Sequence, residues 1–428
     1  DTPEVMPDLP LQGIRILSME QAAALPFATR HLADLGAEVI RVQSHKRPAG
    51  AVLDGSLCRN KSMLGLDLAT PQGATVFLKL AAACDVVAHN FTPRVMHKYG
   101  IDYEGVKAVN ENVIYCSLTG FGSTGQWADR PLYGPGAEAM SGQNLMIGEP
   151  EALTPGRPGT ITYADNICGL NLVFAILVAL ERRDLTSCGE HIDISLYETG
   201  VCQVGAAIAE HSFGAPLPQR SGNQDVNYAI HGVIDTRGED RHIAIAVTDE
   251  QLGTFLDALA LDSPEQLPAL LKQQSCEEIT EKLQAAGIAA SPVADAADVA
   301  GDAHLWSRQH FGFYTGDADQ MPQFGPAWGD GGELAMQPPR HTGADNSRVL
   351  GSVAGYSAEE ISALTENGTV GKVEPKQATP TGSPTGSPIG SLTRPTTDVR
   401  IKRGELSRVD VENGGWRAMR KHKSNPIP

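Results

Sequence analysis

Short runs of β-branched and other apolar residues alternate with helical patterns of apolar spacing in the first half of the chain. The apolar runs predict strands at residues 13–19, 37–42, 85–88, 112–118 and 190–196. The helical patterns cover residues 26–35, 70–84 and 166–183. Thr70 and Pro71 are suited to start the second of these helices as its cap and first-turn proline. Strands that alternate with helices form βαβ units, so we predict an α/β fold with a parallel sheet covered on both faces.

The pattern changes near Arg220, where a second unit is expected to begin. Two strands should pair there, at residues 228–235 and 242–247. Ser275 and Ser357 each have a glutamate three residues on, which is the pattern of a capping box at the start of a helix. Beyond Gly371 the chain is rich in Thr, Pro, Gly and Ser, and such a segment cannot bury enough surface to fold alone.

Composition and charge exclude several classes of protein to which this chain could belong. The chain has 428 residues, 41% of them hydrophobic and 20% charged, a globular balance that excludes a disordered or collagen-like protein. Its net charge of -17 repels nucleic acid and anionic lipid, so we expect neither as a general partner. The charge is uneven, because the segment from Lys372 to the end holds 11 basic and 5 acidic residues.

The cysteines and the apolar segments indicate the cellular compartment in which the protein is expected. Seven cysteines without a Cys-x-x-Cys pair predict reduced core residues rather than disulfides or a zinc site. Residues 1–10 are acidic and rich in proline, unlike a signal peptide. The most apolar stretch, residues 167–180, is too short to cross a bilayer and is typical of a buried helix. We therefore expect a cytoplasmic protein with no membrane partner.

A glycine-rich segment, residues 120–125, matches the dinucleotide-binding pattern Gly-x-Gly-x-x-Gly after a predicted strand. That function needs a helix to open at the motif, so that its N-terminus meets the pyrophosphate. Residues 126–131 instead have the composition of a loop. We therefore expect no nicotinamide cofactor.

Asp165 lies where the long apolar helix of residues 166–183 is expected to begin. One interpretation is a plain helix cap, because aspartate is among the best residues at that position. The other is a nucleophilic carboxylate, which the helix N-terminus would keep ionised and which can form a covalent acyl intermediate. The pattern alone leaves both open.

A polar segment, residues 89–98, directly follows a predicted strand. It is either a solvated loop and helix face or a binding loop. In the second case Asn90 and Phe91 would hold an adenine-like group, while Arg94 and Lys98 would meet phosphates. The two histidines at its ends lie eight residues apart without a further ligand, so we expect no metal site.

Several blocks of this sequence, in order, resemble the family III CoA-transferases, the group that contains formyl-CoA transferase and carnitine CoA-transferase. The blocks are residues 13–17, 32–42, 60–68, 90–91, 120–131, the segment around Asp165, and residues 179–182, 287–293 and 341–351. The resemblance covers roughly residues 10–370. Ordered blocks of this number are specific, whereas any one alone would be weak.

The resemblance implies a CoA-transferase in which Asp165 attacks an acyl-CoA thioester, forms a mixed anhydride and then an aspartyl-CoA thioester, and passes CoA to a carboxylic acid without a metal. It also assigns the CoA contacts by motif position. Ala22 and Ala24 would line the pantetheine channel, Leu66, Asn90 and Phe91 the nucleotide, Lys98 a phosphate, and Tyr133 the thioester. Arg94 stands where the family usually has a glycine, so its phosphate contact rests on the polar segment alone. In the family that tyrosine is usually followed by aspartate, and here Gly134 follows it.

The resemblance further implies an interlocked homodimer with a Rossmann-like large domain made from both ends of the chain. The expected parts are a large domain in residues 10–205 and 326–370, an inserted smaller α+β domain in residues 220–325, and a basic low-complexity tail in residues 371–428.

Two alternatives remain. The same fold hosts 2-methylacyl-CoA racemases, whose catalytic histidine would fall at Tyr133. A tyrosine with a pKa of ~10 is poorly suited to α-proton exchange near neutral pH, which disfavours that alternative. The other is a non-catalytic CoA-binding scaffold, with the acidic body giving solubility and the basic tail docking a partner.

Overall fold

A computed structural model describes residues 9–46, 54–157, 162–217, 219–315, 323–325, 327 and 335–373. The described residues form two compact units. The first comprises those up to Ile147 and those within Leu153–Gln219 and Gly312–Gln377, and the second comprises Gly148–Ala152 and Arg220–Phe311. The domain boundary expected near residue 325 and the low-complexity tail stay predictions, because much of residues 316–334 and all of 374–428 lie outside the described residues.

The first unit contains a six-stranded sheet. Its strands are β1 Arg15–Met19, β2 Glu38–Gln43, β3 Lys61–Gly65, β4 Val86–His89, β5 Ile114–Thr119 and β6 Glu190–Ser195. They pair in the order β3-β2-β1-β4-β5-β6, and every pair is parallel. The predicted α/β class with a parallel sheet is confirmed. β3 was not predicted, because its sequence Lys-Ser-Met-Leu-Gly has no apolar run of strand type.

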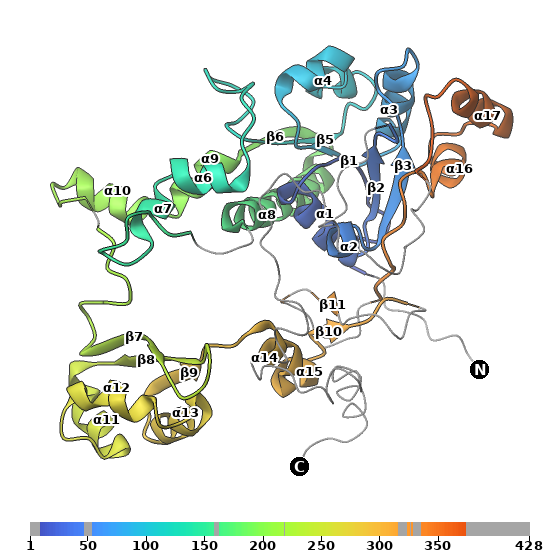
Figure 1. Ribbon diagram of the computed structural model, residues 1–428. Helices are drawn as coiled ribbons and strands as arrows, with labels where there is room; N and C mark the ends of the chain where they lie inside the picture. The colour runs from blue at the N-terminus through green and yellow to red at the C-terminus, as the bar shows by residue number, and fades with distance from the viewer. Residues whose placement is uncertain are drawn as a thin grey trace, which may run out of the picture. The chain divides into compact units, whose positions relative to one another are not determined.

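Helices cover both faces of this sheet (Figure 1). On one face α1 Ala24–Asp34 and α8 Tyr163–Thr186 pack together. On the other lie α3 Gly73–Ala81, α4 Pro93–Tyr99 and α5 Tyr103–Lys107. Successive strand residues point to opposite faces, so Ile16 of β1 joins the first core and Leu17 the second.

The last described segment of the chain returns to the edge of the sheet at β3. Asp345 accepts a hydrogen bond from the Met63 amide at 2.9 Å, and Asn346 accepts one from the Gly65 amide, also at 2.9 Å. The segment continues through α16 Asn346–Arg348, a π-helical turn Val349–Val353 and α17 Ala358–Glu366. Figure 1 shows it in orange beside the blue β3 and α3. The capping box predicted at Ser357 is present.

Two sequence expectations about helices are wrong. Thr70 is not a helix cap: its hydroxyl donates to the Asp67 carbonyl in a turn, and α3 begins only at Gly73. Residues 167–180, expected to be too short to cross a bilayer, lie in α8, which runs for 24 residues and is long enough to cross one; the helix expected at residues 166–183 is itself present.

By length and composition, α8 is apolar enough to cross a membrane, and half of its most apolar window is buried inside the protein. Its packing on α1 is close. A side chain at Gly169 would place its Cβ 2.7 Å from the Ala24 carbonyl oxygen, so only glycine allows this approach. The remaining helices of the unit are α2 Asp54–Leu57, α6 Gly134–Met140, α7 Gln143–Met146, α9 Leu196–Cys202 and α10 Gly205–Ser212.

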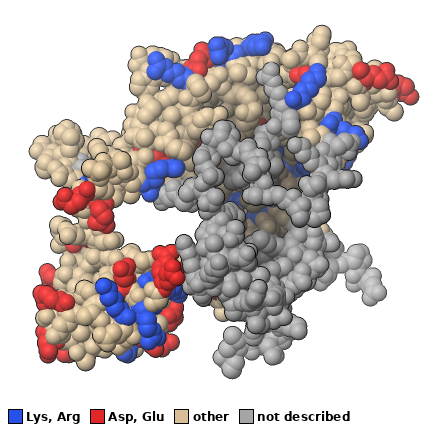
Figure 2. All heavy atoms as spheres, in the orientation of Figure 1, with Lys and Arg blue, Asp and Glu red and all other residues tan. Residues whose placement is uncertain are grey.

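The second unit is α+β. Its strands β7 Ile230–Asp235, β8 His242–Val247 and β9 Ala289–Pro292 form an antiparallel sheet in that order. Its helices are α11 Leu252–Leu259, α12 Leu267–Leu271, α13 Cys276–Ala285, α14 Ala296–Gly301 and α15 Ala303–Ser307. The capping box predicted at Ser275 starts α13. Figure 2 shows acidic side chains around a smaller group of basic ones on the visible face of this unit. Two short strands follow in the chain, β10 Phe311–Gly312 and β11 Gln323–Phe324.

Candidate active site

The strand order of the first unit creates a place for a ligand. The chain winds in one direction from β1 to β3 and in the other from β4 to β6, so the order reverses between the neighbours β1 and β4. In open α/β sheets, ligands bind outside the carboxyl ends of the strands at such a switch point. A cavity of about 210 Å³ lies there, and it is lined by the residues that follow β1, β4 and β5 and by Asp165.

A side-chain amide ties two of these loops together. Asn90, directly after β4, accepts a hydrogen bond from the Gln21 amide at 2.9 Å and donates one to the Gln21 carbonyl at 2.7 Å. Ala22, which follows Gln21 in the loop after β1, has φ of 55°, which residues other than glycine rarely adopt. Such strain persists only where surrounding contacts hold it, and it is often found at functional sites. The Asn90 amide is such a contact for this wall of the cavity.

Asp165 reaches the cavity from the first turn of α8. The helix cap is Thr162, not Asp165, so the interpretation of Asp165 as a plain cap is wrong. The Thr162 hydroxyl instead donates a hydrogen bond to Oδ2 of Asp165. The aspartate is 8% exposed, and its carboxylate contacts both the cavity and the start of α6.

The surroundings of Asp165 raise its pKa, whereas the helix N-terminus was expected to lower it. Burial raises the pKa of Asp165, the hydrogen bond from Thr162 lowers it, and the nearby charge of Glu138 raises it, with a net increase above the usual value. Burial disfavours the charged carboxylate more than the first turn of the helix favours it. The result is a carboxylate more basic than an exposed one.

Gly134, the first residue of α6, has no side chain, and the Asp165 carboxylate occupies the space where one would lie. A Cβ at Gly134 would lie 2.4 Å from Oδ2 of Asp165 and 2.5 Å from Cβ of Thr162. Both distances are far below van der Waals contact, so any side chain at this position has to displace Asp165 and its hydrogen-bond donor together.

We therefore expect Gly134→Ala to leave the protein folded and to slow any reaction at Asp165 by about 100-fold, the usual effect of a misplacement near 1 Å. The matched control is Gly205→Ala, because Gly205 is also the first residue of a helix and its Cβ would meet nothing within 4 Å. Steady-state rates of both variants, with their melting temperatures, check the expectation. Equal rates in the two variants would contradict it.

The cavity brings together six of the residues singled out from the sequence: Ala22, Ala24, Asn90, Phe91, Tyr133 and Asp165. Three others lie elsewhere. Leu66 is 1% exposed and packs in the core beneath the returning segment of the chain. Arg94 and Lys98 are exposed on α4, outside the cavity lining.

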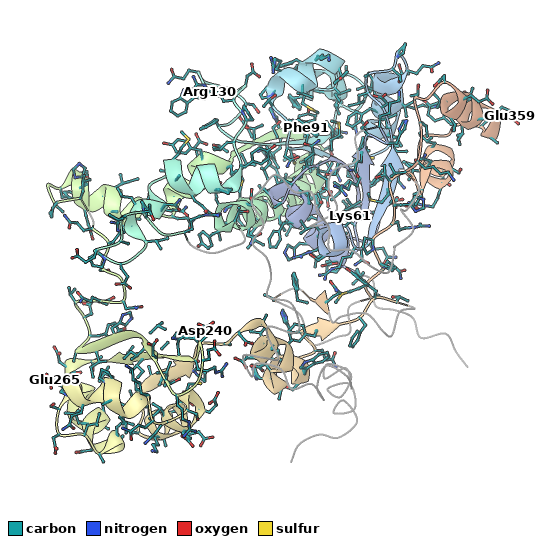
Figure 3. All side chains as sticks on the ribbon, in the orientation of Figure 1. Lys61, Phe91, Arg130, Asp240, Glu265 and Glu359 are labelled. Atoms are coloured by element: carbon teal, nitrogen blue, oxygen red, sulfur yellow. The ribbon has the colours of Figure 1, made fainter. Side chains whose placement is uncertain are left out.

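Arg130 also lines the cavity, and sequence reasoning did not single it out (Figure 3, where Arg130 and Phe91 are labelled). Its guanidinium lies 5.6 Å from the centre of the Trp127 ring and makes no ion pair with any described residue. The neighbouring Asp129 accepts a hydrogen bond from the Arg94 amide at 3.0 Å, which holds this segment against α4. The available signal was the block of residues 128–131, which carried the family resemblance.

A buried ionic cluster stands behind the loop that follows β1. Lys61 Nζ lies 2.6 Å from Oε1 of Glu20, 2.6 Å from the Thr29 hydroxyl and 3.0 Å from the Pro26 carbonyl (Figure 3). Arg41 Nε lies 3.4 Å from the same Glu20 oxygen. Burial by itself raises the pKa of Glu20, but the charges of Lys61 and Arg41 outweigh burial and hold that pKa below its usual value. Glu20 immediately precedes the cavity residue Gln21, so this cluster anchors the cavity loop in the core.

Neither a metal site nor a nucleotide-binding glycine motif occurs at this cavity in the part of the chain that the structure describes. Among the described residues no group of three or more His, Cys, Asp or Glu side chains is placed to hold a metal ion. The glycine-rich residues 120–125 form a loop, and the next helix, α6, begins only at Gly134. The seven cysteines are all free; Cys188 and Cys202 are exposed and the other five are buried.

Comparisons with known proteins agree with this arrangement. The model of CoA-transferase family III matches residues 11–346. The chain is 28% identical over 395 residues to the succinyl-CoA–L-malate CoA-transferase beta subunit of Chloroflexus aurantiacus, a match that covers 83% of this chain and 97% of that protein. It is 30% identical over 331 residues to the succinyl-CoA:glutarate CoA-transferase of Mus musculus, covering 69% of this chain and 74% of that protein. A CAIB/BAIF family protein from Brucella suis superposes with a TM-score of 0.73 at 27% identity, covering 81% of this chain and 100% of that one.

Proposed function

The chain belongs to CoA-transferase family III, and on that basis we propose that it moves CoA from an acyl-CoA thioester to a free carboxylic acid, with Asp165 as the nucleophile. The observation that carries the proposal is the position of Asp165. It is a largely buried carboxylate in a cavity at the switch point of a parallel sheet, where ligands of such folds bind.

The chemistry needs only this carboxylate and the two substrates. A carboxylate oxygen of Asp165 attacks the thioester carbonyl carbon, the C–S bond breaks, and CoA leaves as a thiolate with the electron pair. The thiolate then attacks the Asp165 carbonyl of the mixed anhydride, which releases the donor acid and leaves an aspartyl-CoA thioester. The acceptor carboxylate reverses these two steps. Each intermediate contains an activated acyl bond, an anhydride or a thioester, so the free energy of the thioester is conserved through the transfer.

The described residues suggest where CoA would lie. Ala22 and Ala24 have small side chains on the cavity wall and would flank the pantetheine arm, with Tyr133 near the thioester. Asn90 and Phe91 would meet the nucleotide, and Leu66 would support that region from the core. The exposed Arg94 and Lys98 on α4 would bind the phosphates.

We propose a dicarboxylic acid as the acceptor. The named relatives transfer CoA to malate and to glutarate, which each have a second carboxylate. The formyl-CoA type expected from the sequence does not enter the proposal, because the relatives have other substrates. Arg130 lines the cavity and has no acidic partner among the described residues, so its guanidinium is available to pair with the second carboxylate.

We expect Arg130→Met to raise the KM for malate or glutarate by at least about tenfold and to leave the KM for a monocarboxylic acid unchanged, since a charge-assisted hydrogen bond contributes ~1.5–3 kcal/mol. An acceptor screen with succinyl-CoA measures both constants. A rise in the KM of the acyl-CoA donor alone would assign Arg130 to CoA instead. The same assay separates the alternatives, because a racemase would exchange an α-proton without any acceptor and a scaffold would bind CoA without turnover.

We also propose the interlocked homodimer. The outer face of α8 supports it, since Leu170, Phe174 and Val178 lie at helical spacing and are 39%, 69% and 49% exposed in the single chain. An apolar stripe of this kind is usually covered by another protein surface.

A further inference from the structure

The face of α6 that meets Asp165 carries a second acidic residue. Gly134, on this face, would place a Cβ 2.4 Å from the Asp165 carboxylate. Residues four apart on a helix lie on the same face, one turn on, and the residue four after Gly134 is Glu138. Since α6 packs against α8, which carries Asp165, the two carboxylates belong to the same helix–helix contact.

Glu138 is held in a way that is unusual for a glutamate. It is 0% exposed, and its Oε2 accepts two hydrogen bonds from Arg157, at 3.1 Å from Nε and 3.0 Å from Nη2. Its other oxygen, Oε1, is buried and has no hydrogen-bond partner among the described residues. A buried charge with half of its oxygens unsatisfied is costly to keep, so a function is expected of it.

Among the described residues, no other acidic group opposes Asp165 at this contact. Near this contact, the titratable and charged residues on the neighbouring elements are Glu138 on α6, Tyr133 just before it, Arg157 bound to Glu138, Tyr163 and Cys168 on α8, Tyr197, Glu198 and Cys202 on α9, Arg130 in the cavity wall, and Arg30, His31 and Asp34 in the second half of α1. Glu198 is exposed, and α1 meets α8 near Asp165 through its first residue, Ala24. Glu138 is therefore the acidic neighbour that acts on Asp165, in agreement with its part in raising the Asp165 pKa.

We propose that Glu138, anchored by Arg157, is a positioning residue that drives Asp165 toward its uncharged, acylated state. The inference rests on the proposed function. When Asp165 attacks the thioester, its negative charge leaves with the CoA thiolate, and Asp165 stays uncharged as anhydride and as thioester. A fixed negative charge beside Asp165 destabilises the free carboxylate but not these intermediates, so it favours acylation. Arg157 partly offsets that charge and keeps it in place.

Two substitutions that each remove a charge should move the pKa of Asp165 in opposite directions. Glu138→Gln removes the negative charge, so the acid limb of the kcat/KM profile for the acyl-CoA should move down by roughly one pH unit, with acylation slowed about tenfold. Arg157→Gln removes the compensating positive charge, so the acid limb should move up. Single-turnover acylation and full pH profiles measure both effects. The matched controls are Glu190→Gln and Arg182→Gln, which break an exposed pair of the same kind at 2.9 Å, and neither should move the limb.

A second readout does not need activity. The pH at which the stability gap between the Asp165 and Asp165→Asn proteins stops growing reports the folded pKa of Asp165, and it should be lower in the Glu138→Gln background. If the wild type transfers no CoA, the proposed function is wrong, but this titration still tests whether Glu138 acts on Asp165. If activity falls in both variants but neither readout moves, Glu138 is merely structural and the inference is overturned. Arg157 is 40% exposed and stays solvated when Glu138 loses its charge, so Glu138→Gln should fold and give a result even where Arg157→Gln, which leaves a buried charge unpaired, does not.

Discussion

Asp165→Asn is expected to lower the rate of CoA transfer by at least about 10³-fold, because removal of a nucleophile abolishes the covalent route. Asparagine keeps the size of the side chain and can still accept the hydrogen bond from Thr162, so the cavity keeps its shape. CoA binding should therefore persist. Steady-state assay together with calorimetric titration of CoA separates the two properties, and a variant with ordinary transfer activity would rule out Asp165 as the nucleophile.

The same variant should be more stable than the wild type at neutral pH. The folded pKa of Asp165 is raised by burial, so its contribution to stability is full below the unfolded value, about 3.9, and is lost as the pH rises through the folded pKa. Asparagine carries no such penalty. Chemical unfolding should thus show a gain for Asp165→Asn at pH 8 that disappears toward pH 4. Loss of activity with a gain of stability excludes misfolding as the reason for inactivity.

Lys61→Met is expected to destabilise the fold by about 3–5 kcal/mol, the usual result of removing one partner from a buried ion pair. Lys61 has a fully buried side chain, and its loss leaves Glu20 with a charge that Arg41, at 3.4 Å, compensates only in part. Since Glu20 precedes the cavity loop, the KM for the acyl-CoA should rise as well. Urea unfolding and a donor titration measure the two effects.

The double variant Glu20→Gln with Lys61→Met is the control, because removal of both charges should recover a large part of the lost stability. The pH dependence gives a second check. The folded pKa of Glu20 is lowered, so its stabilising contribution is present above the unfolded value, about 4.3, and is lost as the pH falls through the folded pKa. The gap between wild type and Lys61→Met should narrow over that range. A double variant as unstable as Lys61→Met would refute this role of the pair.

The periodicity of apolar residues predicted five strands of the sheet within about two residues, because β1, β2, β4 and β5 are buried runs in a parallel sheet and β6, at its edge, alternates apolar and polar residues. It did not predict β3, whose first residues, Lys61 and Ser62, are polar. Lys61 is buried there only because Glu20 and Thr29, distant in sequence, supply its partners. Such compensation is a property of the tertiary structure and leaves no local pattern.

The candidate site was predicted in part. Asp165 and five of the other residues that line the cavity follow from the family resemblance. The spacing of residues alone left Asp165 open between a helix cap and a nucleophile. The structure shows that Thr162 is the cap, because the backbone geometry decides at which residue the helix begins. Glu138 could not be found from the sequence. On a short helix a glutamate is ordinarily solvent-exposed, and only the packing of α6 on α8 buries it.

The most direct test of Asp165 as the nucleophile is to mix the protein with succinyl-CoA in the absence of an acceptor, trap the product with hydroxylamine or borohydride, and locate the modification by peptide mass spectrometry. We expect the modification on Asp165 in the wild type and none in Asp165→Asn. Modification of a different residue, or transfer of CoA without any covalent adduct, would contradict the proposed mechanism.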